Sequence, residues 1–174
     1  VLKNDMEQGG VLEERFERLN RSIYGSLADR TFVTLVMGEL DVETGRLVLA
    51  DCGCPYPYHY RAFTGEVVEL EVDAFPLGVR PDAVYRIIET VLKPGDRVVF
   101  CSDGLVEARN GSGERFGFDR TGEVVREVCG EGLSAGATVE QILEAVGQFQ
   151  GEEVQLDDMT CVVVEAGSQN PAQA

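Results

Sequence analysis

The chain has few basic residues, a single histidine and no long apolar run. Lys and Arg together number 15 against 31 Asp and Glu, which gives a formal net charge of −16. This charge would be repelled by nucleic-acid phosphates and by anionic membrane surfaces, so we expect neither as a partner. No stretch approaches the roughly 18 apolar residues that a membrane span requires. The N-terminal residues also lack the basic-then-apolar pattern of a secretory signal.

The scarcity of histidine limits the catalytic chemistry that the sequence can offer. His59 alternates with Tyr58 and Tyr60 in a predicted strand, and we expect it at a surface or half-buried position. No Ser or Cys partner stands at a recognisable spacing from it, which argues against a catalytic triad.

The five cysteines form no secretory framework. An odd number without a secretory context predicts reduced thiols and a cytoplasmic location. Cys101 and Cys161 lie inside apolar runs, and we expect both in the core. Cys52 and Cys54 have the spacing of a zinc-ligand pair. Because no second Cys or His pair has such a spacing, zinc is the less favoured interpretation.

Two apolar runs each adjoin an acidic group. The run 98–101 leads into Asp103-Gly104, and Asp157-Asp158 opens the run 159–164. If the two strands are antiparallel neighbours, Asp103 and Asp157 converge at one edge of the sheet. Carboxylates gathered there repel each other unless a cation is present, which favours Mg²⁺ or Mn²⁺ held by oxygen ligands. Taken singly, each acidic group is better explained as an ordinary turn.

Hydrophobic periodicity indicates the order of the elements. A helix is predicted over 11–27, followed by strands, two helices that include 122–129 and one that opens at Thr138 with Gln141 as its capping partner, and a final strand. The predicted strands before the helices cover 31–41, 46–51, 56–63, 66–72, 85–92 and 97–102. The first two are joined by a hairpin turn at Glu43-Thr44-Gly45, and the last two form a hairpin around 93–96. Strands that gather before helices predict an α+β fold with two packed antiparallel sheets.

A series of short motifs runs from about Leu12 to Glu165. The most specific is Ser102-Asp103-Gly104-Leu105-Val106-Glu107-Ala108-Arg109-Asn110, and the last is Asp157-Asp158-Met159-Thr160. The others are Leu19-Asn20-Arg21, Gly38-Glu39-Leu40-Asp41, Ala50-Asp51-Cys52-Gly53-Cys54-Pro55, Phe75-Pro76-Leu77-Gly78-Val79, Leu92-Lys93-Pro94-Gly95-Asp96 and Phe116-Gly117. In this order they resemble the bacterial metal-dependent protein serine/threonine phosphatases of the PPM (PP2C-like) group. The closest resemblance is to the sporulation and stress-response branch, which acts on anti-sigma-factor antagonists.

The resemblance implies a structure and a function. The expected fold is an antiparallel β-sandwich flanked by helices, with two Mn²⁺ or Mg²⁺ ions at one end. Asp103 and Asp157 would be metal ligands and catalytic residues, and the Gly104 backbone would lie beside the metal. Asp158 would either hold a water on the metal or hydrogen-bond to the groups that surround its ligands. The implied activity is hydrolysis of phosphoserine or phosphothreonine on a regulatory protein such as an anti-sigma-factor antagonist. The sequence identifies no substrate-binding residue, and exposed apolar character around Ile23 and Tyr24 leaves a homodimer contact open.

The sequence also departs from the family pattern. The family's G-D-x-x-D and D-x-x-G-[KH]-G elements have no counterpart before Val11, where Asp5 and Glu7 lack the glycine pattern. Cys54 replaces the usual His, and Asp51 replaces the usual Asn. We therefore expect residues 1–166 to be the C-terminal portion of a PPM-type domain, truncated at the N-terminus, and 167–174 to be a disordered tail. The alternative is a divergent member of the family that has lost the first half of the site.

Two aspartates do not complete a two-metal site, so we expect little or no activity from this chain by itself. The alternative function is a catalytically inactive regulatory or binding module with the phosphatase fold. An unrelated β-rich structural domain whose acidic residues form turns is the third possibility, and the ordered motifs make it the least favoured.

Overall fold

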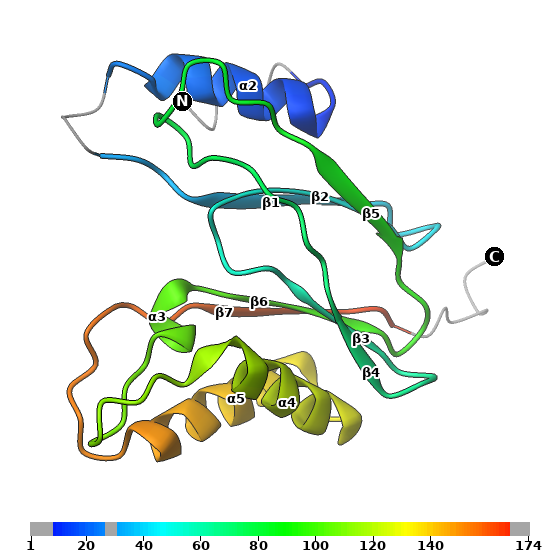
Figure 1. The fold of residues 1–174 in the computed structure, drawn as a ribbon. Coiled ribbons are helices and arrows are strands. Elements are labelled where there is room, and N and C mark those ends of the chain that lie inside the picture. Colours follow the sequence, from blue (N-terminus) through cyan, green and yellow to red (C-terminus); the bar gives the residue numbers. More distant parts are fainter. Residues whose placement is uncertain (1–8, 27–30, 168–174) are drawn as a thin grey trace. The chain divides into compact units, whose positions relative to one another are not determined.

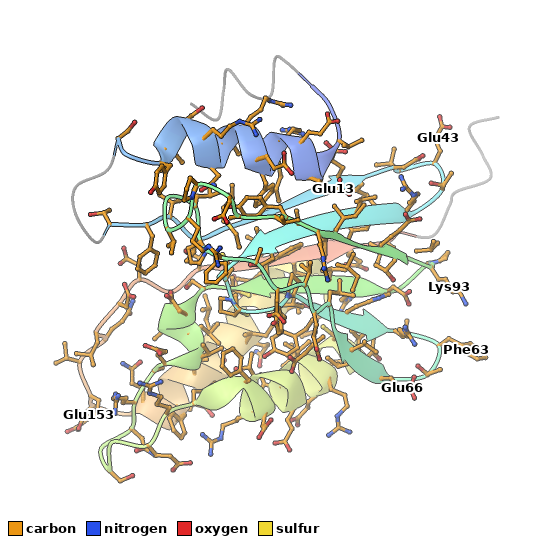
Figure 2. All side chains as sticks on the ribbon, turned by 45° about the horizontal axis from the view of Figure 1, so that its top comes forward. Glu13, Glu43, Phe63, Glu66, Lys93 and Glu153 are labelled. Atoms are coloured by element: carbon orange, nitrogen blue, oxygen red, sulfur yellow. The ribbon has the colours of Figure 1, made fainter. Side chains whose placement is uncertain are left out.

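A computed structural model of the chain describes residues 9–26 and 31–167, shown as a ribbon in Figure 1 and with side chains in Figure 2. These residues form two compact units, and each unit contains one antiparallel sheet. Among them, the first unit comprises 9–26, 31–54 and 71–91, and the second comprises 55–70 and 92–167.

The helix predicted over 11–27 is shorter than expected. It ends at Ile23, and residues 24–26 form a turn in which Gly25 has φ of +76°, a conformation that ends a helix. Leu27 lies outside the described residues, as does the predicted tail over 167–174 apart from its first residue.

The first unit is a three-stranded sheet with a helix packed on it. The strand order is β1-β2-β5. The helix places Leu12, Phe16 and Leu19 in one buried cluster with Val48 and Ala50 of the sheet. These helical residues recur at steps of four and three, so a single apolar face meets the sheet, as the periodicity predicts. The elements are α2 (Leu12–Ile23), β1 (Leu35–Leu40), β2 (Arg46–Cys52) and β5 (Ile87–Val91).

The hairpin that joins β1 to β2 is the one predicted at Thr44-Gly45. The Asp41 carboxylate accepts hydrogen bonds from the backbone N–H groups of Glu43 (2.9 Å) and Thr44 (3.1 Å). Gly45 has φ of +73°, a left-handed conformation that glycine adopts without a steric cost. The side chain of Asp41 therefore fixes the turn, and the turn fixes the register of the two strands.

The second unit is a four-stranded sheet with two long helices on one face. The strand order is β4-β3-β6-β7, and α4 and α5 lie together beneath the sheet in Figure 1. Tyr58, Val99, Val125, Ile142 and Val146 belong to the buried cluster between the helices and the sheet. The elements are β3 (Tyr58–Arg61), β4 (Glu66–Glu69), β6 (Arg97–Cys101), α3 (Asp103–Val106), α4 (Gly117–Gly130), α5 (Ala135–Gln150) and β7 (Cys161–Glu165).

The predicted hairpin of the strands over 85–92 and 97–102 is wrong. β5 pairs with β2 in the first unit, whereas β6 pairs with β3 and β7 in the second. The turn between them is still ordered by Asp96, whose carboxylate accepts a hydrogen bond from the Lys93 N–H at 2.9 Å. A Pro-Gly turn indicates where the chain reverses but does not decide which strand each arm will pair with.

His59 is not at a surface or half-buried position, as the sequence suggested, but is only 2 % exposed. Its Nε2 lies 3.2 Å from a carboxylate oxygen of Asp96, and Asp96 also accepts the Ala62 N–H. Since the same carboxylate organises the turn at Lys93, His59 helps to hold that turn from inside the sheet. Its place in the fold is structural.

The last helix begins earlier than predicted. Its N-cap is Ser134, whose hydroxyl accepts a hydrogen bond from the Ala137 N–H. Thr138, the predicted first residue, lies inside the helix, fully buried, and its hydroxyl donates to the Ser134 carbonyl at 3.0 Å. It also accepts a hydrogen bond from the buried guanidinium of Arg97 at 3.3 Å. The sequence contains two plausible caps, and tertiary packing uses Thr138 as the partner of Arg97.

Within the described ranges, no helix combines the length and the apolar character that crossing a membrane requires.

Candidate metal centre

The two acidic motifs meet because β6 and β7 are antiparallel neighbours. Cys101 at the end of β6 stands opposite Cys161 at the start of β7, and the pairing continues to Arg97 and Glu165. Asp103 lies two residues beyond the end of β6, and Asp157 lies four residues before the start of β7. Figure 1 shows the two strands side by side, with α3 beginning where β6 ends. The predicted convergence of the two motifs at one edge of the sheet is confirmed.

The two loops touch at Gly104. A Cβ atom added at this residue would lie 2.3 Å from the carbonyl oxygen of Asp158 and 3.3 Å from the carbonyl carbon of Asp157. Real Cβ atoms essentially never approach other atoms so closely, so only glycine allows the 157–158 backbone to pack here. Glycine is therefore required at position 104 because the 157–158 backbone packs against it, whether or not a turn is formed there.

Ser102 holds the loop that contains Asp157 and Asp158 in place through hydrogen bonds, a role that the sequence did not indicate. Its hydroxyl donates to the Asp158 carbonyl at 3.1 Å and accepts the Thr160 N–H at 2.9 Å. Its backbone N–H donates to the Thr160 carbonyl at 2.9 Å. Three hydrogen bonds thus hold the Asp157 loop against the start of α3. A serine ahead of Asp-Gly was visible in the sequence, but its partners lie more than fifty residues away and had no local signal.

Each carboxylate of Asp103 and Asp157 uses one oxygen in a hydrogen bond to the backbone. One oxygen of Asp103 accepts the Gly104 N–H at 3.0 Å, and one oxygen of Asp157 accepts the Asp158 N–H at 2.8 Å. Among the described residues, the second oxygen of each has no hydrogen-bond partner, and neither carboxylate pairs with a cationic side chain. Exposed carboxylate oxygens oriented by backbone amides fit a hard divalent cation.

This donor set is nevertheless incomplete. No group of three or more His, Cys, Asp or Glu side chains in the described part of the chain has the arrangement of a metal site. The residues present therefore fit part of an oxygen-ligand site for Mg²⁺ or Mn²⁺, which takes its remaining ligands from water or from other segments.

A small pocket of about 150 Å³ opens beside the two loops. Its walls include Gly104, Asp157 and Met159, and also Arg109 and Gln150. Gln150 ends α5 and is only 9 % exposed, although its side-chain amide makes no hydrogen bond to the described residues. Arg109 stands in the motif that follows Asp103, but nothing in the sequence marked Gln150, because only the packing of α5 brings it here.

The fold is that of the PP2C-like phosphatases. The SiaA-PP2C domain of Pseudomonas aeruginosa superposes with a TM-score of 0.80 at 22% identity, over 94% of this chain and 64% of that chain. The manganese-presoaked phosphatase domain of SpoIIE from Bacillus subtilis gives a TM-score of 0.64 at 19% identity, over 98% and 72%. The α+β fold class predicted from the sequence is confirmed.

The chain belongs to the family of stage II sporulation protein E (SpoIIE), whose family model matches residues 1–167. It is also 24% identical to phosphoserine phosphatase RsbU of Bacillus subtilis (strain 168) over 148 residues. That match covers 85% of this chain but only 43% of RsbU, so the chain spans less than half of that relative. The resemblance to the sporulation and stress-response branch is thereby confirmed at the level of the family.

Proposed function

We propose that this chain carries part of the metal site of a metal-dependent protein phosphatase, which hydrolyses phosphoserine or phosphothreonine on a regulatory protein of the anti-sigma-factor-antagonist type. The observation that carries the proposal is the contact of Gly104 with the Asp158 carbonyl, which holds the two acidic loops together at the β6–β7 edge. Membership in the SpoIIE family and the similarity to a phosphoserine phosphatase support the same activity.

In this proposal Asp103 and Asp157 hold the metal through the carboxylate oxygens that have no protein partner. The amides of Gly104 and Asp158 orient these carboxylates, and Ser102 keeps the second loop in place. In the same proposal Asp158, which is exposed on this loop, holds a water on the metal or hydrogen-bonds to the groups around its ligands. A divalent ion bound here would lower the pKa of its water and neutralise phosphoryl oxygens. The ion would also offset locally the repulsion between a phosphorylated substrate and a chain of net charge −16.

The second candidate is a regulatory or binding module with the phosphatase fold but no catalysis. It is favoured by the absence, within the described residues, of any group of three potential metal-ligating side chains. Such a module would recognise a phosphoprotein or a partner domain without hydrolysing it.

Manganese calorimetry on the chain tests the proposed site. We expect a binding heat in the parent that is lost in Asp103→Asn and in Asp157→Asn, because each change removes a charged oxygen ligand but keeps the shape of the side chain. Glu152→Gln is the matched control, since Glu152 is an exposed acid in the loop that leads to Asp157. Equal binding by all four proteins would refute the assignment of Asp103 and Asp157.

Hydrolysis separates the two candidate functions. Because two aspartates do not complete the site, this assay uses a complete phosphatase domain that contains this chain, as the parent and with each of the same three substitutions. The four proteins are incubated with Mn²⁺ and a phosphoserine-bearing anti-sigma-factor antagonist, and released phosphate is measured. Release that depends on Asp103 supports the phosphatase. Metal binding that depends on Asp103, with no release of phosphate, favours the inactive module.

A further inference from the structure

Two cysteines face each other across β6 and β7. Cys101 and Cys161 are directly opposite in the antiparallel register. The Ser102 N–H donates to the Thr160 carbonyl in the adjacent pair, and the Ala166 N–H donates to the Asp96 carbonyl five positions away, so both of these pairs are hydrogen-bonded. Because the pairs alternate along antiparallel strands, Cys101 and Cys161 form a non-hydrogen-bonded pair, the kind with Cα atoms only about 4.5 Å apart.

The thiols of this pair point to the same side of the sheet. Both contribute to the cluster that α4 and α5 cover, Cys101 as a buried residue and Cys161 as a partly buried one. Both are free thiols. Cys161 is the more accessible of the two, so it is the thiol that an external reagent would meet first.

We propose that Cys101 and Cys161 form an oxidative modification site, a thiol pair that closes to a reversible cross-strand disulfide when it reacts with a low-molecular-weight disulfide. Disulfides occur at Cα separations from about 4.4 Å upward, so the register already places the two residues within range. None of the described cysteines is bonded in the structure, so the pair starts from the reduced state.

The reaction is a two-step thiol–disulfide exchange. The Cys161 thiolate attacks one sulfur of the external disulfide, which breaks that bond and releases one thiolate. The Cys101 sulfur, having lost its proton to solvent, then attacks the Cys161 sulfur of the mixed disulfide and releases the second thiolate. The protein loses two protons and two electrons, and the external disulfide is reduced to two thiols.

The two cysteines are direct neighbours of the residues that hold the Asp157 loop, so their oxidation should affect that loop. Ser102, which fastens the Asp157 loop, follows Cys101 directly, and Thr160, its partner, precedes Cys161. A disulfide favours a Cα separation of about 5.5–6 Å, wider than the roughly 4.5 Å of this pair, so closing the bond spreads the strands at this point and shifts the contacts that hold the loop. We expect oxidation to weaken manganese binding, and this second part rests on the proposed function.

The test uses oxidised glutathione on the folded chain, followed by blocking of the remaining thiols, digestion and mass analysis. We expect a protein lighter by two hydrogen atoms, a linked peptide pair containing Cys101 and Cys161, and full reversal by dithiothreitol. Cys129→Ala is the control, because Cys129 is a free thiol of the same buried cluster but does not face either cysteine in the register of β6 and β7. It should form the link as the parent does.

The proposal fails if Cys101 and Cys161 are both still free in the parent after treatment, or if Cys161 is linked to Cys129 instead. This test uses only the parent protein, so it does not depend on whether any variant folds. Cys101→Ala and Cys161→Ala should each leave only mixed disulfides with glutathione, removable by dithiothreitol. Manganese calorimetry before and after oxidation is a separate readout: an unchanged binding heat in a protein with the linked peptides would leave the modification site intact and refute only its coupling to the metal loops.

Discussion

The backbone carbonyl of Asp158 occupies the space that a side chain at Gly104 would need. The distance from an added Cβ to this oxygen is 2.3 Å, and the oxygen belongs to backbone that Ser102 holds from the other side. The contact cannot be relieved by turning a flexible side chain, because the atom that clashes is main chain. A substitution at residue 104 therefore tests directly whether the two acidic loops pack as the structure shows.

Gly104→Ala should displace the 157–158 loop and weaken manganese binding at least about tenfold, with a loss of roughly 1–3 kcal/mol of unfolding free energy typical of overpacking. Calorimetry and urea unfolding measure the two effects. Gly147→Ala in α5 is the matched control, because a Cβ there meets nothing within 4 Å. It should stabilise the helix by up to about 1 kcal/mol and leave metal binding unchanged. Normal binding in Gly104→Ala would contradict the packing.

Asn20 joins the helix of the first unit to the loop that follows Leu77. The residue is 1 % exposed; its amide N–H donates to the Arg80 carbonyl at 2.7 Å, and its amide oxygen accepts the Gly78 N–H at 2.9 Å. Asn20→Ala should cost about 1–3 kcal/mol, because both backbone groups lose a buried partner. Arg21→Ala, which removes an exposed pair with Glu17, should cost less than about 1 kcal/mol in the same urea titration. Similar losses in the two variants would mean that the Asn20 bridge does not form.

The cap of α5 provides a test of where the helix begins. Ser134→Ala removes the hydroxyl that accepts the Ala137 N–H and should cost about 1 kcal/mol. Gln141→Ala should have little effect, because the helix starts six residues before it and Gln141 is exposed. Thermal unfolding of the two variants distinguishes the observed start from the capping box that the sequence suggested at Thr138.

Asp51 should make the first unit sensitive to pH. The residue is 1 % exposed, one of its oxygens has no partner, and burial raises the pKa of its carboxyl from 3.8 to about 6. The folded protein therefore binds this proton more tightly than the unfolded chain does, and ionisation between about pH 4 and pH 6 lowers stability.

Asp51→Asn removes this ionisation, so we expect its unfolding free energy relative to the parent to be higher at pH 7.5 than at pH 5. Urea unfolding of both proteins at the two values measures the difference. Asp41→Asn controls for the loss of a negative charge, because hydrogen bonds from Thr44 and Glu43 lower the pKa of that exposed carboxyl. Asp41→Asn should give no gain at pH 7.5, and an equal gain in both variants would show that net charge rather than burial is responsible.

Local sequence signals predicted the elements well and their partners less well. The periodicity of Leu12, Phe16 and Leu19 specified the buried face of α2, and Thr44-Gly45 specified a hairpin, because both signals act within a few residues. The hairpin expected around Lys93 failed for the opposite reason. β5 and β6 are both strands beside a turn, but their hydrogen bonds go to β2 and β3, which no local pattern encodes.

The same division applies to the candidate site. Asp103, Asp157 and Gly104, the second residue of α3, were visible in the sequence, since carboxylates beside apolar strands and an Asp-Gly pair are short-range patterns. The sequence did not predict that Ser102 hydrogen-bonds to the Asp157 loop or that Gln150 lines the neighbouring pocket. Each of these depends on segments about fifty residues apart being packed together.

The sequence by itself determined the acidic character of the chain, the order of its helices and strands, and the two motifs that offer oxygen ligands. These follow from composition and from periodicities that elementary backbone geometry imposes on neighbouring residues. Only the tertiary structure decided that β6 pairs with β7, that Gly104 touches the Asp158 carbonyl and that Cys101 faces Cys161. Strand pairing joins residues distant in the chain, and its energy comes from close packing that local patterns do not record.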